Sequence, residues 1–490
     1  MDVKKLFIRC VGKVLDFIGL KQIVKKAIKE HKKKKFENEI SFTVKSKSNG
    51  EKVIEKTLKK IVLPENYKGQ KIILILGSIV GDPRECSYFN IISDLLKEKG
   101  YRLILITEAV LADNKLVNQL VFPVFKAPAI LGKNLYINNI KINNPLEIED
   151  DYLKWGIDNL VKRHSDMTLE YASQIAYYTQ SFYTKLFNLL NPIKILIWNN
   201  LYAVHHIIDE IAKENNLSPF YMEFGSIPGT MALDQMGQMG ESEVAREYNS
   251  FKEKPILEKE IERAQIVWEY LKISRLNRKA QGTPPEVIEQ IIKMKDEKPI
   301  VFFAGQNDFE SGLQPYTERT RDWHSPLFKT SFEALRYLSE ICKKNNWNII
   351  YKPHPLMVSL GSEQKDCPDN VFYVETADIN DLIDLSDVTV TILSQTGYVS
   401  TIREKATLML GYNQLRGKDC TYEAFDYESI EPKLKEAIKN GFTNMQKNAF
   451  KKHLAQVLKY YLFDDLQSTH IRYGQEPEQF VSLIIGKRFD

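Results

Sequence analysis

A histidine between two prolines is the first residue whose type and setting could support chemistry. His354 lies in the segment Lys352-Pro353-His354-Pro355, directly after an apolar run. The prolines restrict the backbone on either side of the histidine. An imidazole held at a strand end can donate a hydrogen bond to a phosphate oxygen or act as an acid. The alternative is an ordinary surface turn, because His-Pro pairs are common.

A Ser/Thr segment is the second candidate. Ser394-Gln395-Thr396-Gly397 lies between a predicted strand at 388–393 and a predicted helix that carries Glu404. Hydroxyls and backbone N–H groups at a helix N-terminus form a site for anions. The alternative is plain N-capping of that helix. Because the histidine and the Ser/Thr segment follow successive strand units of one predicted domain, each supports a functional role for the other.

Two carboxylates share the segment 223–234. Glu223 precedes Phe224 and Gly225 at the end of a short predicted strand, and Asp234 follows in a Gly/Pro-containing stretch. A glycine beside a carboxylate lets a substrate approach the backbone closely. Glu223 could serve as a general base for an acceptor hydroxyl, and paired carboxylates often organise glycosyl transfer. Alternatively, either carboxylate binds the loop backbone.

Further polar groups follow other predicted strands. Gly305-Gln306-Asn307-Asp308 comes after the strand at 299–304, and His324-Ser325-Pro326 lies beyond it. Asn199 and Asn200 come after a strand in the other half of the chain. In open α/β sheets, ligands bind at the carboxyl ends of the strands. All these groups are therefore expected to face one cleft.

The elements that must position these groups alternate between short apolar runs and helical patterns. The runs predict strands at 71–77, 101–107, 193–199, 219–225, 299–304, 347–352, 371–374, 388–393 and 407–411. The alternation indicates parallel α/β sheets. Residues 226–243 show neither the spacing of a helix nor the alternation of a strand, and are predicted to form a long functional loop.

The length of 490 residues corresponds to two or three domains. We expect an α/β protein with two Rossmann-like domains facing a cleft, plus an N-terminal amphipathic helix. The predicted segments are a basic helix at 1–40, a linker at 41–64, a first domain at 65–270, a helical connection at 271–297, a second domain at 298–442, and C-terminal helices at 443–490 that pack back across the halves.

The net charge of +4 is unevenly placed along the chain. Residues 1–40 contain 12 Lys/Arg and 5 Asp/Glu, a net of +7, so the remaining 450 residues carry −3. Apolar residues recur at steps of three and four in this segment, which predicts an amphipathic helix. Such a helix could lie on an anionic membrane surface. The alternative is a packed helix with a solvated lysine face.

Composition excludes several classes of protein. The 43% apolar content rules out a disordered chain, and no apolar run approaches the roughly 20 residues that span a bilayer. Five cysteines without a CxxC pair form neither a disulfide framework nor a zinc site, which suits a reducing cytoplasm. Neither HExxH nor a P-loop occurs, and the body of the chain lacks the basic stripe typical of nucleic-acid binding.

The ordered motifs resemble a known family. The pieces E-x-G-x-x-P-G-T…D…G (223–240), GQ…D (305–308), HSP (324–326), KPHP (352–355) and S-x-T-G…E (394–404) resemble the bacterial capsule polysaccharide biosynthesis family, which includes Kdo transferases. An acidic-x-Gly, HP and Ser/Thr order also resembles the bacterial sialyltransferases. Both groups have the GT-B architecture and use CMP-activated keto-sugar acids without a metal.

This resemblance implies roles for individual residues. His354 would contact the CMP phosphate and help the leaving group to depart. Ser394 and Thr396 would bind that phosphate, with Lys352 as a nearby positive charge. The other residues expected to bind the donor are Gln306, Gln395, Gly397 and Glu404. The CMP-sugar would be a substrate, and no metal or other cofactor is expected.

The resemblance also implies the reaction. Glu223 would be the catalytic carboxylate, and Asp234 would bind or act as the second one. The family contains retaining and inverting enzymes, so nucleophile and base both stay open. The first domain would hold a glycan or glycolipid acceptor, and the second the nucleotide sugar.

We therefore expect a metal-independent glycosyltransferase of capsule or surface polysaccharide biosynthesis that transfers Kdo or a sialic-acid-like sugar. It would be cytoplasmic, peripheral at the inner face of the cell membrane, and would bind no nucleic acid. One alternative is a CDP-polyol phosphotransferase of the teichoic-acid type. Others are a non-catalytic glycan-binding partner of an export complex and a nucleotide-sugar epimerase of GT-B shape.

Overall fold

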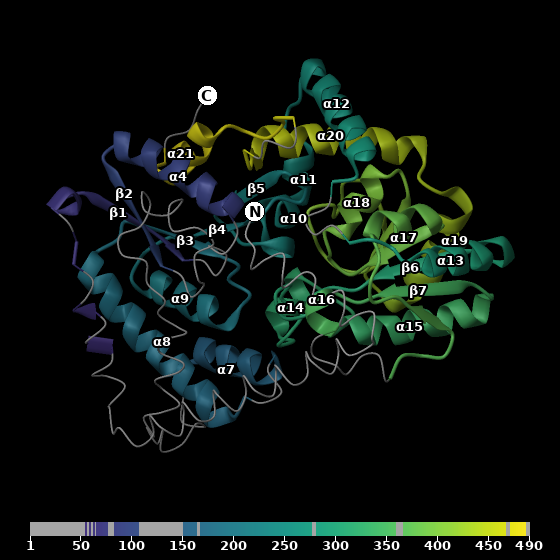
Figure 1. Cartoon of the computed structure of the whole chain (residues 1–490), viewed down its shortest axis with the longest axis horizontal. Helices are drawn as coiled ribbons and strands as arrows, with labels where there is room; N and C mark the ends of the chain where they lie inside the picture. The colour runs from purple at the N-terminus through teal and green to yellow at the C-terminus, as the bar shows by residue number, and fades with distance from the viewer. Residues whose placement is uncertain are drawn as a thin grey trace, which may run out of the picture.

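The computed structural model describes residues 54–55, 58–59, 62–63, 65–76, 83–106, 150–163, 167–276, 281–358, 366–466 and 471–486. The predicted basic helix at 1–40 lies outside these residues, as does most of the predicted linker. The described residues form two α/β halves, each built on a six-stranded sheet (Figure 1). This confirms the predicted α/β class with two domains.

The sheet of the first half has the strand order β12-β5-β4-β3-β1-β2. Its parallel strands are β1 (Lys71–Leu76), β2 (Tyr101–Ile106), β3 (Lys194–Trp198) and β4 (Phe220–Phe224). Two antiparallel strands, β5 (Thr230–Asp234) and β12 (Leu462–Asp464), complete it at one edge. The first sheet is therefore mixed, whereas a parallel sheet was expected.

Helices cover both faces of this sheet. One face packs against α7 (Asp151–Arg163), α8 (Leu169–Leu190) and α9 (Ala203–Glu214). The other packs against α4 (Pro83–Glu98) and α21 (Pro477–Ile484). Because successive strand residues point to opposite faces, Ile72 and Leu74 enter the first core and Ile73 enters the second. Burial on both faces explains why these strands read as continuous apolar runs.

The sheet of the second half is parallel throughout, in the order β11-β10-β9-β6-β7-β8. Its strands are β6 (Ile300–Ala304), β7 (Asn348–Lys352), β8 (Val371–Tyr373), β9 (Val388–Thr391), β10 (Ala406–Met409) and β11 (Tyr422–Glu423). One face packs against α15 (Ser331–Asn345) and α19 (Tyr427–Asn440), and the other against α13 (Pro285–Glu297) and α17 (Ile379–Leu385).

The chain crosses between the halves twice. α12 (Glu258–Ser274) precedes the second half, and α20 (Asn444–Tyr460) leaves it and packs on α12 along the top of Figure 1. β12 then joins the edge of the first sheet. The indole of Trp268 on α12 donates to the carbonyl of Ile402 at 2.8 Å, which anchors α12 to the second half. The C-terminal segment thus completes the sheet of the first half.

The long loop predicted at 226–243 is wrong in part. This stretch contains β5, a 3-10 helix η3 (Met239–Glu241) and the start of α10 (Glu243–Arg246). The return from β4 to β5 turns at Gly229, whose φ of 85° favours glycine. All five residues of β5 are buried between β4 and β12, so the strand shows no alternation, and one of its partners lies more than 200 residues away.

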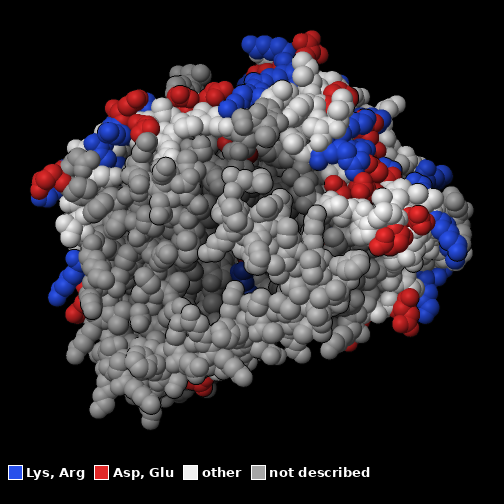
Figure 2. Space-filling model, in the orientation of Figure 1, with Lys and Arg blue, Asp and Glu red and all other residues white. Residues whose placement is uncertain are grey.

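The described surface carries charges of both signs. Figure 2 shows Lys/Arg and Asp/Glu side chains intermixed along the upper and right edges of this face. Within the described parts of the chain, no helix is long and apolar enough to cross a membrane.

Candidate active site

A cleft of about 720 Å³ lies between the two halves, at the carboxyl ends of their strands. It is lined by residues at the ends of β3 and β4 in the first half and of β6, β7 and β9 in the second. Seven of the ten predicted site residues line it: Glu223, Gln306, Lys352, His354, Ser394, Gln395 and Thr396. Residues more than 170 positions apart thus meet in one place, as the strand-end rule predicts.

His354 is held by the short helix that follows it, α16 (Pro355–Val358). The backbone N–H of Leu356 donates to its Nδ1 at 3.2 Å, and its carbonyl accepts from Met357 at 2.8 Å. Because Nδ1 accepts a hydrogen bond, the proton of the neutral ring lies on Nε2. The ring can therefore offer an Nε2–H donor to an anion in the cleft.

Lys352 brings a positive charge to the same wall of the cleft. It is the last residue of β7, only 7% exposed, and its Nζ lies 3.5 Å from the carbonyl oxygen of Glu375. Burial lowers its pKa, while the negative charges of Asp378 and Glu375 raise it. A partly desolvated ammonium gains more from a bound anion than an exposed one does.

Ser394 and Thr396 form a local hydroxyl pair that lines the same cleft. The Oγ of Ser394 donates to the Oγ1 of Thr396 at 3.1 Å and accepts from the N–H of Thr396 at 3.2 Å. Gln395 between them precedes α18 (Thr396–Ile402) and donates to the carbonyl of Phe224 in the first half at 3.3 Å. The segment therefore touches both walls of the cleft.

Glu223 lines the opposite wall, on β4 of the first half. Its Oε1 lies 3.5 Å from the backbone N of Met239 and 3.5 Å from the Nε2 of Gln414. Gln414 belongs to the second half, so the carboxylate is contacted from both halves. Glu223 is half-buried and faces the cleft that Lys352 and His354 also line.

Gln306 shapes the wall of the cleft. It is 4% exposed; its Oε1 accepts from the N–H of Leu393 at 3.1 Å, and its Nε2 donates to the Oγ of Ser311 at 3.0 Å. The side chain thus ties the end of β6 to the end of β9.

Asp234 does not line the cleft, contrary to expectation. Its carboxylate accepts backbone N–H bonds from Met236 at 2.7 Å, Glu243 at 2.8 Å and Gly237 at 3.3 Å. Burial raises its pKa to about 6, against the lowering effect of these donors. Asp234 therefore organises the backbone behind Glu223, and the structure does not place the two as paired carboxylates in the cleft.

Glu404 and Gly397 also lie away from the cleft. The carboxylate of Glu404 pairs with the Nζ of Lys272 at 2.6 Å and with that of Lys447 at 2.7 Å, which joins α18 to α12 and α20. A Cβ at Gly397 would meet the Sδ of Met409 at 3.1 Å, so this glycine allows α18 to pack on β10. In this structure Glu404 makes ion pairs and Gly397 makes a packing contact, and neither residue lines the cleft.

Arg163, Glu310 and Trp198 are among the cleft-lining residues that had not been predicted. The Nη2 of Arg163 on α7 lies 2.5 Å from the Oε1 of Glu310, which follows β6 in the second half. The predicted Asn199 joins them, because its Nδ2 donates to the carbonyl of Glu310 at 3.2 Å. No local signal marks Arg163 or Glu310, since they meet only through the packing of the halves.

A buried seam joins the halves beside the cleft. We define the seam as Glu241, Arg319, His324 and Lys418. Glu241 from the first half accepts from the Nη2 of Arg319 at 2.6 Å and lies 3.2 Å from the Nε2 of His324. Burial alone would raise the pKa of Glu241, but Arg319 and His324 hold it well below its usual range. His324 of the HSP motif is thus a seam residue.

Lys418 fixes the seam at a second point. Its Nζ donates to the carbonyls of Val244 at 2.9 Å and Tyr248 at 3.3 Å, both in the first half, although only 2% of the residue is exposed. Burial lowers its pKa to about 8. The ammonium group therefore links the two halves through backbone carbonyls. Among the described residues, no carboxylate lies within hydrogen-bonding distance of it.

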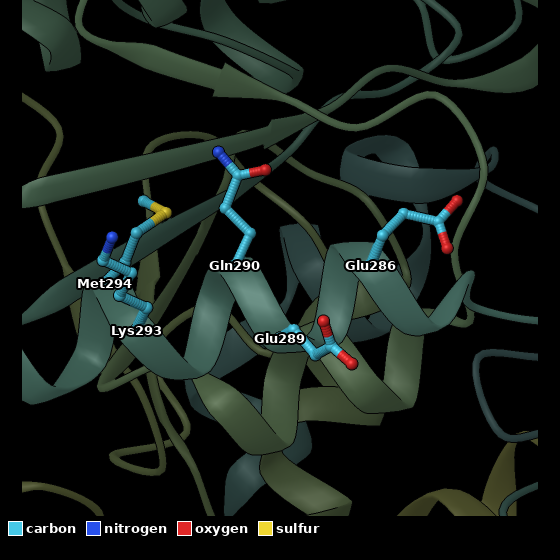
Figure 3. A pocket seen from close by; sticks show the side chains of 5 residues that line it. All are labelled: Glu286, Glu289, Gln290, Lys293 and Met294. Atoms are coloured by element: carbon cyan, nitrogen blue, oxygen red, sulfur yellow. The ribbon is translucent and has the colours of Figure 1, made fainter.

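A side-chain cluster on α9 and a hollow beside α13 are two further candidate sites. Among the residues that the structure describes, His206, Asp209 and Glu210 have ligand atoms close enough to share a metal ion. Lys213 already pairs with Asp209 at 3.0 Å and Glu210 at 2.8 Å, so both carboxylates have a cationic partner within the same helix. A hollow of about 570 Å³ beside α13 is lined by exposed residues such as Glu289 and Lys293 and contains no predicted site residue (Figure 3).

No protein-family model and no curated protein matches the sequence. Among solved structures, KpsC of Thermosulfurimonas dismutans, a beta Kdo 2,7 transferase, is 19% identical, with a TM-score of 0.39 over 62% of this chain and 89% of its own. The S. aureus MnaA-UDP co-structure is 10% identical, with a TM-score of 0.36 over 86% and 99%. The two α/β halves of this chain around one cleft have the GT-B architecture.

Proposed function

We propose that the chain is a glycosyltransferase that transfers a sugar from a nucleotide-activated donor to a glycan or glycolipid acceptor. One observation carries the proposal: a single cleft has anion-binding side chains on one wall and a carboxylate on the other. The second half supplies Lys352, His354 and the hydroxyl pair of Ser394 and Thr396, and the first half supplies Glu223.

The second-half wall suits the phosphate of a nucleotide sugar. An ammonium, an imidazole N–H and hydroxyl groups together stabilise the charge that develops on a departing phosphate. When the bond between the anomeric carbon and the phosphate oxygen breaks, the electron pair stays on the phosphate, and His354 stabilises it. Lys352 holds the same charge from a position that excludes most water.

The first-half wall suits the acceptor. Glu223 is a carboxylate in the cleft that can take the proton of the attacking hydroxyl, whereas Glu310, which also lines the cleft, is paired with Arg163. The aromatic ring of Trp198, which packs edge-on against Phe224 at 5.1 Å, adds an apolar surface for a sugar ring.

We further propose that the donor is a CMP-activated keto-sugar acid such as Kdo, used without a metal in the assembly of a capsule or surface polysaccharide. This finer statement is supported by the ordered KPHP and S-x-T-G motifs, whose residues 352–354, 394 and 396 line the cleft.

A nucleotide screen tests the donor site. CMP should raise the melting temperature of the full chain more than CDP, UDP or GDP, because a ligand that binds only the folded state stabilises it. The shift should disappear in Ser394→Ala and persist in Glu404→Gln, which alters a carboxylate outside the cleft. If no nucleotide shifts the transition, the donor-site assignment fails.

A turnover assay tests the reaction. The full chain should release CMP from a CMP-activated keto-sugar acid, slowly to water and faster with an acceptor. CMP release from a CDP-polyol, with phosphate retained in the product, would instead indicate the polyol phosphotransferase. Nucleotide binding without turnover of any donor would contradict an enzymatic role.

We also propose that segment 1–40 binds an anionic membrane surface that presents the acceptor. This proposal is supported by the net charge of +7 on the segment. Each basic residue near such a surface contributes about 1 kcal/mol to the free energy of binding. The full chain should sediment with vesicles that contain phosphatidylglycerol, and reversal of the four lysines at 32–35 to glutamate should abolish this. Unchanged sedimentation of that variant would exclude the proposal.

A further inference from the structure

The catalytic carboxylate lies where the two halves meet. Glu223 belongs to β4 of the first half, yet its Oε1 lies 3.5 Å from the Nε2 of Gln414 in the loop after β10. The backbone N of Met239, on η3 of the first half, lies at the same distance from the same oxygen. Both donors therefore converge on Oε1, and each comes from a segment at the boundary between the halves.

The loop that carries Gln414 is docked onto the first half. Lys418 in this loop donates to two carbonyls of the first half, as described above. A Cβ on Gly240 of η3 would lie 2.7 Å from the carbonyl oxygen of Tyr412, so the two backbones touch. The position of Gln414 relative to Glu223 thus depends on how closely the halves approach.

Gln414 itself is buried and charge-neutral. It is 1% exposed, and it lies beside the phenol of Tyr461, a residue that is also near Glu223 and Asp234. A buried amide can orient a carboxylate by donating a hydrogen bond without pairing off its charge. An ammonium at the same place would weaken Glu223 as a base, because an opposite charge stabilises the ionised form.

The distance between Glu223 and Gln414 is long for a hydrogen bond. At 3.5 Å the N–H···O geometry is at the outer limit of a hydrogen bond, and such catalytic contacts often shorten when substrate is bound. A shorter contact in the substrate-bound state would direct the carboxylate. Donor binding in the second half would thereby prepare the first half for reaction.

We propose that Gln414 is a positioning residue, whose amide orients the Glu223 carboxylate when the two halves close on the donor. This inference rests on the proposed glycosyl transfer. It assigns to the second half a part in the acceptor-side chemistry as well as in donor binding. Closure and proton transfer are then linked through one side chain.

Two substitutions separate positioning from folding. Gln414→Met removes the donor at nearly constant volume, and Gln414→Glu replaces it with a like charge beside Glu223. Gln456 is a matched control, because it is equally buried but donates to the carbonyls of Lys252 and Lys254, away from the cleft. Each variant is first compared with the wild type by circular dichroism and thermal unfolding.

Kinetics with a CMP-activated keto-sugar acid and an acceptor provide the readout. Gln414→Met should lower kcat about 10- to 100-fold while the melting shift with CMP stays unchanged. In Gln414→Glu, the acid limb of the kcat profile should move up by about one pH unit, because a like charge raises the pKa of a carboxyl group. Gln456→Met should leave both the kcat and the profile unchanged.

The outcomes distinguish the two proposals. If the wild-type protein turns over no CMP-sugar, the proposed function itself is contradicted. An active wild type whose two Gln414 variants, both folded, keep kcat and the pH profile would leave the function standing and overturn the role of Gln414. A loss of kcat that the Gln456 control shares would assign the effect to general destabilisation, which also overturns it.

Discussion

The cleft and the seam contain the same kinds of side chains in opposite situations. His354, Glu223 and Lys352 line a cleft of about 720 Å³. In the seam, Glu241 is bound by Arg319 and His324, and Lys418 is bound by carbonyls, so their hydrogen-bonding capacity is directed inward. The comparison shows that residue type alone does not indicate a site. What distinguishes a site is that its polar groups face a space that a ligand can enter.

The largest expected effect is on activity in the cleft. Glu223→Gln and His354→Ala should each lower the rate of CMP release in the transfer reaction by about 10²- to 10⁴-fold, the usual worth of an acid or base. Because both side chains are only partly buried, the thermal transition should move little. Transfer that survives both substitutions would show that the cleft and the seam do not differ as proposed.

The seam should respond in the opposite way. Arg319→Met leaves the buried carboxylate of Glu241 without its main partner, which should cost up to about 3 kcal/mol of unfolding free energy after allowance for the partial exposure of Arg319. Urea unfolding measures this, and the double variant with Glu241→Met should recover most of the loss. The control Lys162→Met removes an exposed pair with Asp158 and should change stability by less than about 0.5 kcal/mol.

The pH dependence of stability sharpens the contrast at Lys418. Its pKa is about 8 in the folded chain and has an ordinary value of 10.5. Between these values the unfolded chain binds more protons, so this lysine makes the unfolding free energy rise with pH, by up to about 3 kcal/mol. In the Lys418→Met variant, the unfolding free energy measured with urea should therefore increase less from pH 8 to 10 than in the wild type. Parallel wild-type and variant curves would contradict the lowered pKa.

The smallest effect is expected for a carboxylate in neither region. Glu404→Gln weakens partly exposed pairs with Lys272 and Lys447, which should change stability by less than about 1 kcal/mol. Its kcat should match that of the wild type, in contrast to Glu223→Gln. A large loss of kcat would return Glu404 to the residues expected to bind the donor and remove the distinction drawn from the structure.

Strand ends were predictable because burial on both faces makes parallel strands apolar throughout. That pattern located the residues around 223, 352 and 394 that line the cleft, together with the class of fold. β5 was not recognised, because its pairing with β12 depends on a segment far along the chain. For Asp234, the residue type suggested a second catalytic acid, but nearby backbone N–H groups bind it.

The sequence by itself determined the order of the elements and the strand ends at which polar groups would gather, because both follow from local periodicity and local polarity. Only the tertiary structure decided which of these groups face the cleft and which are paired in the seam. Glu241 and Arg319 are 78 positions apart, and Glu223 and Gln414 are 191 apart. Such contacts depend on how the two sheets pack against each other, and no local sequence pattern predicts that packing.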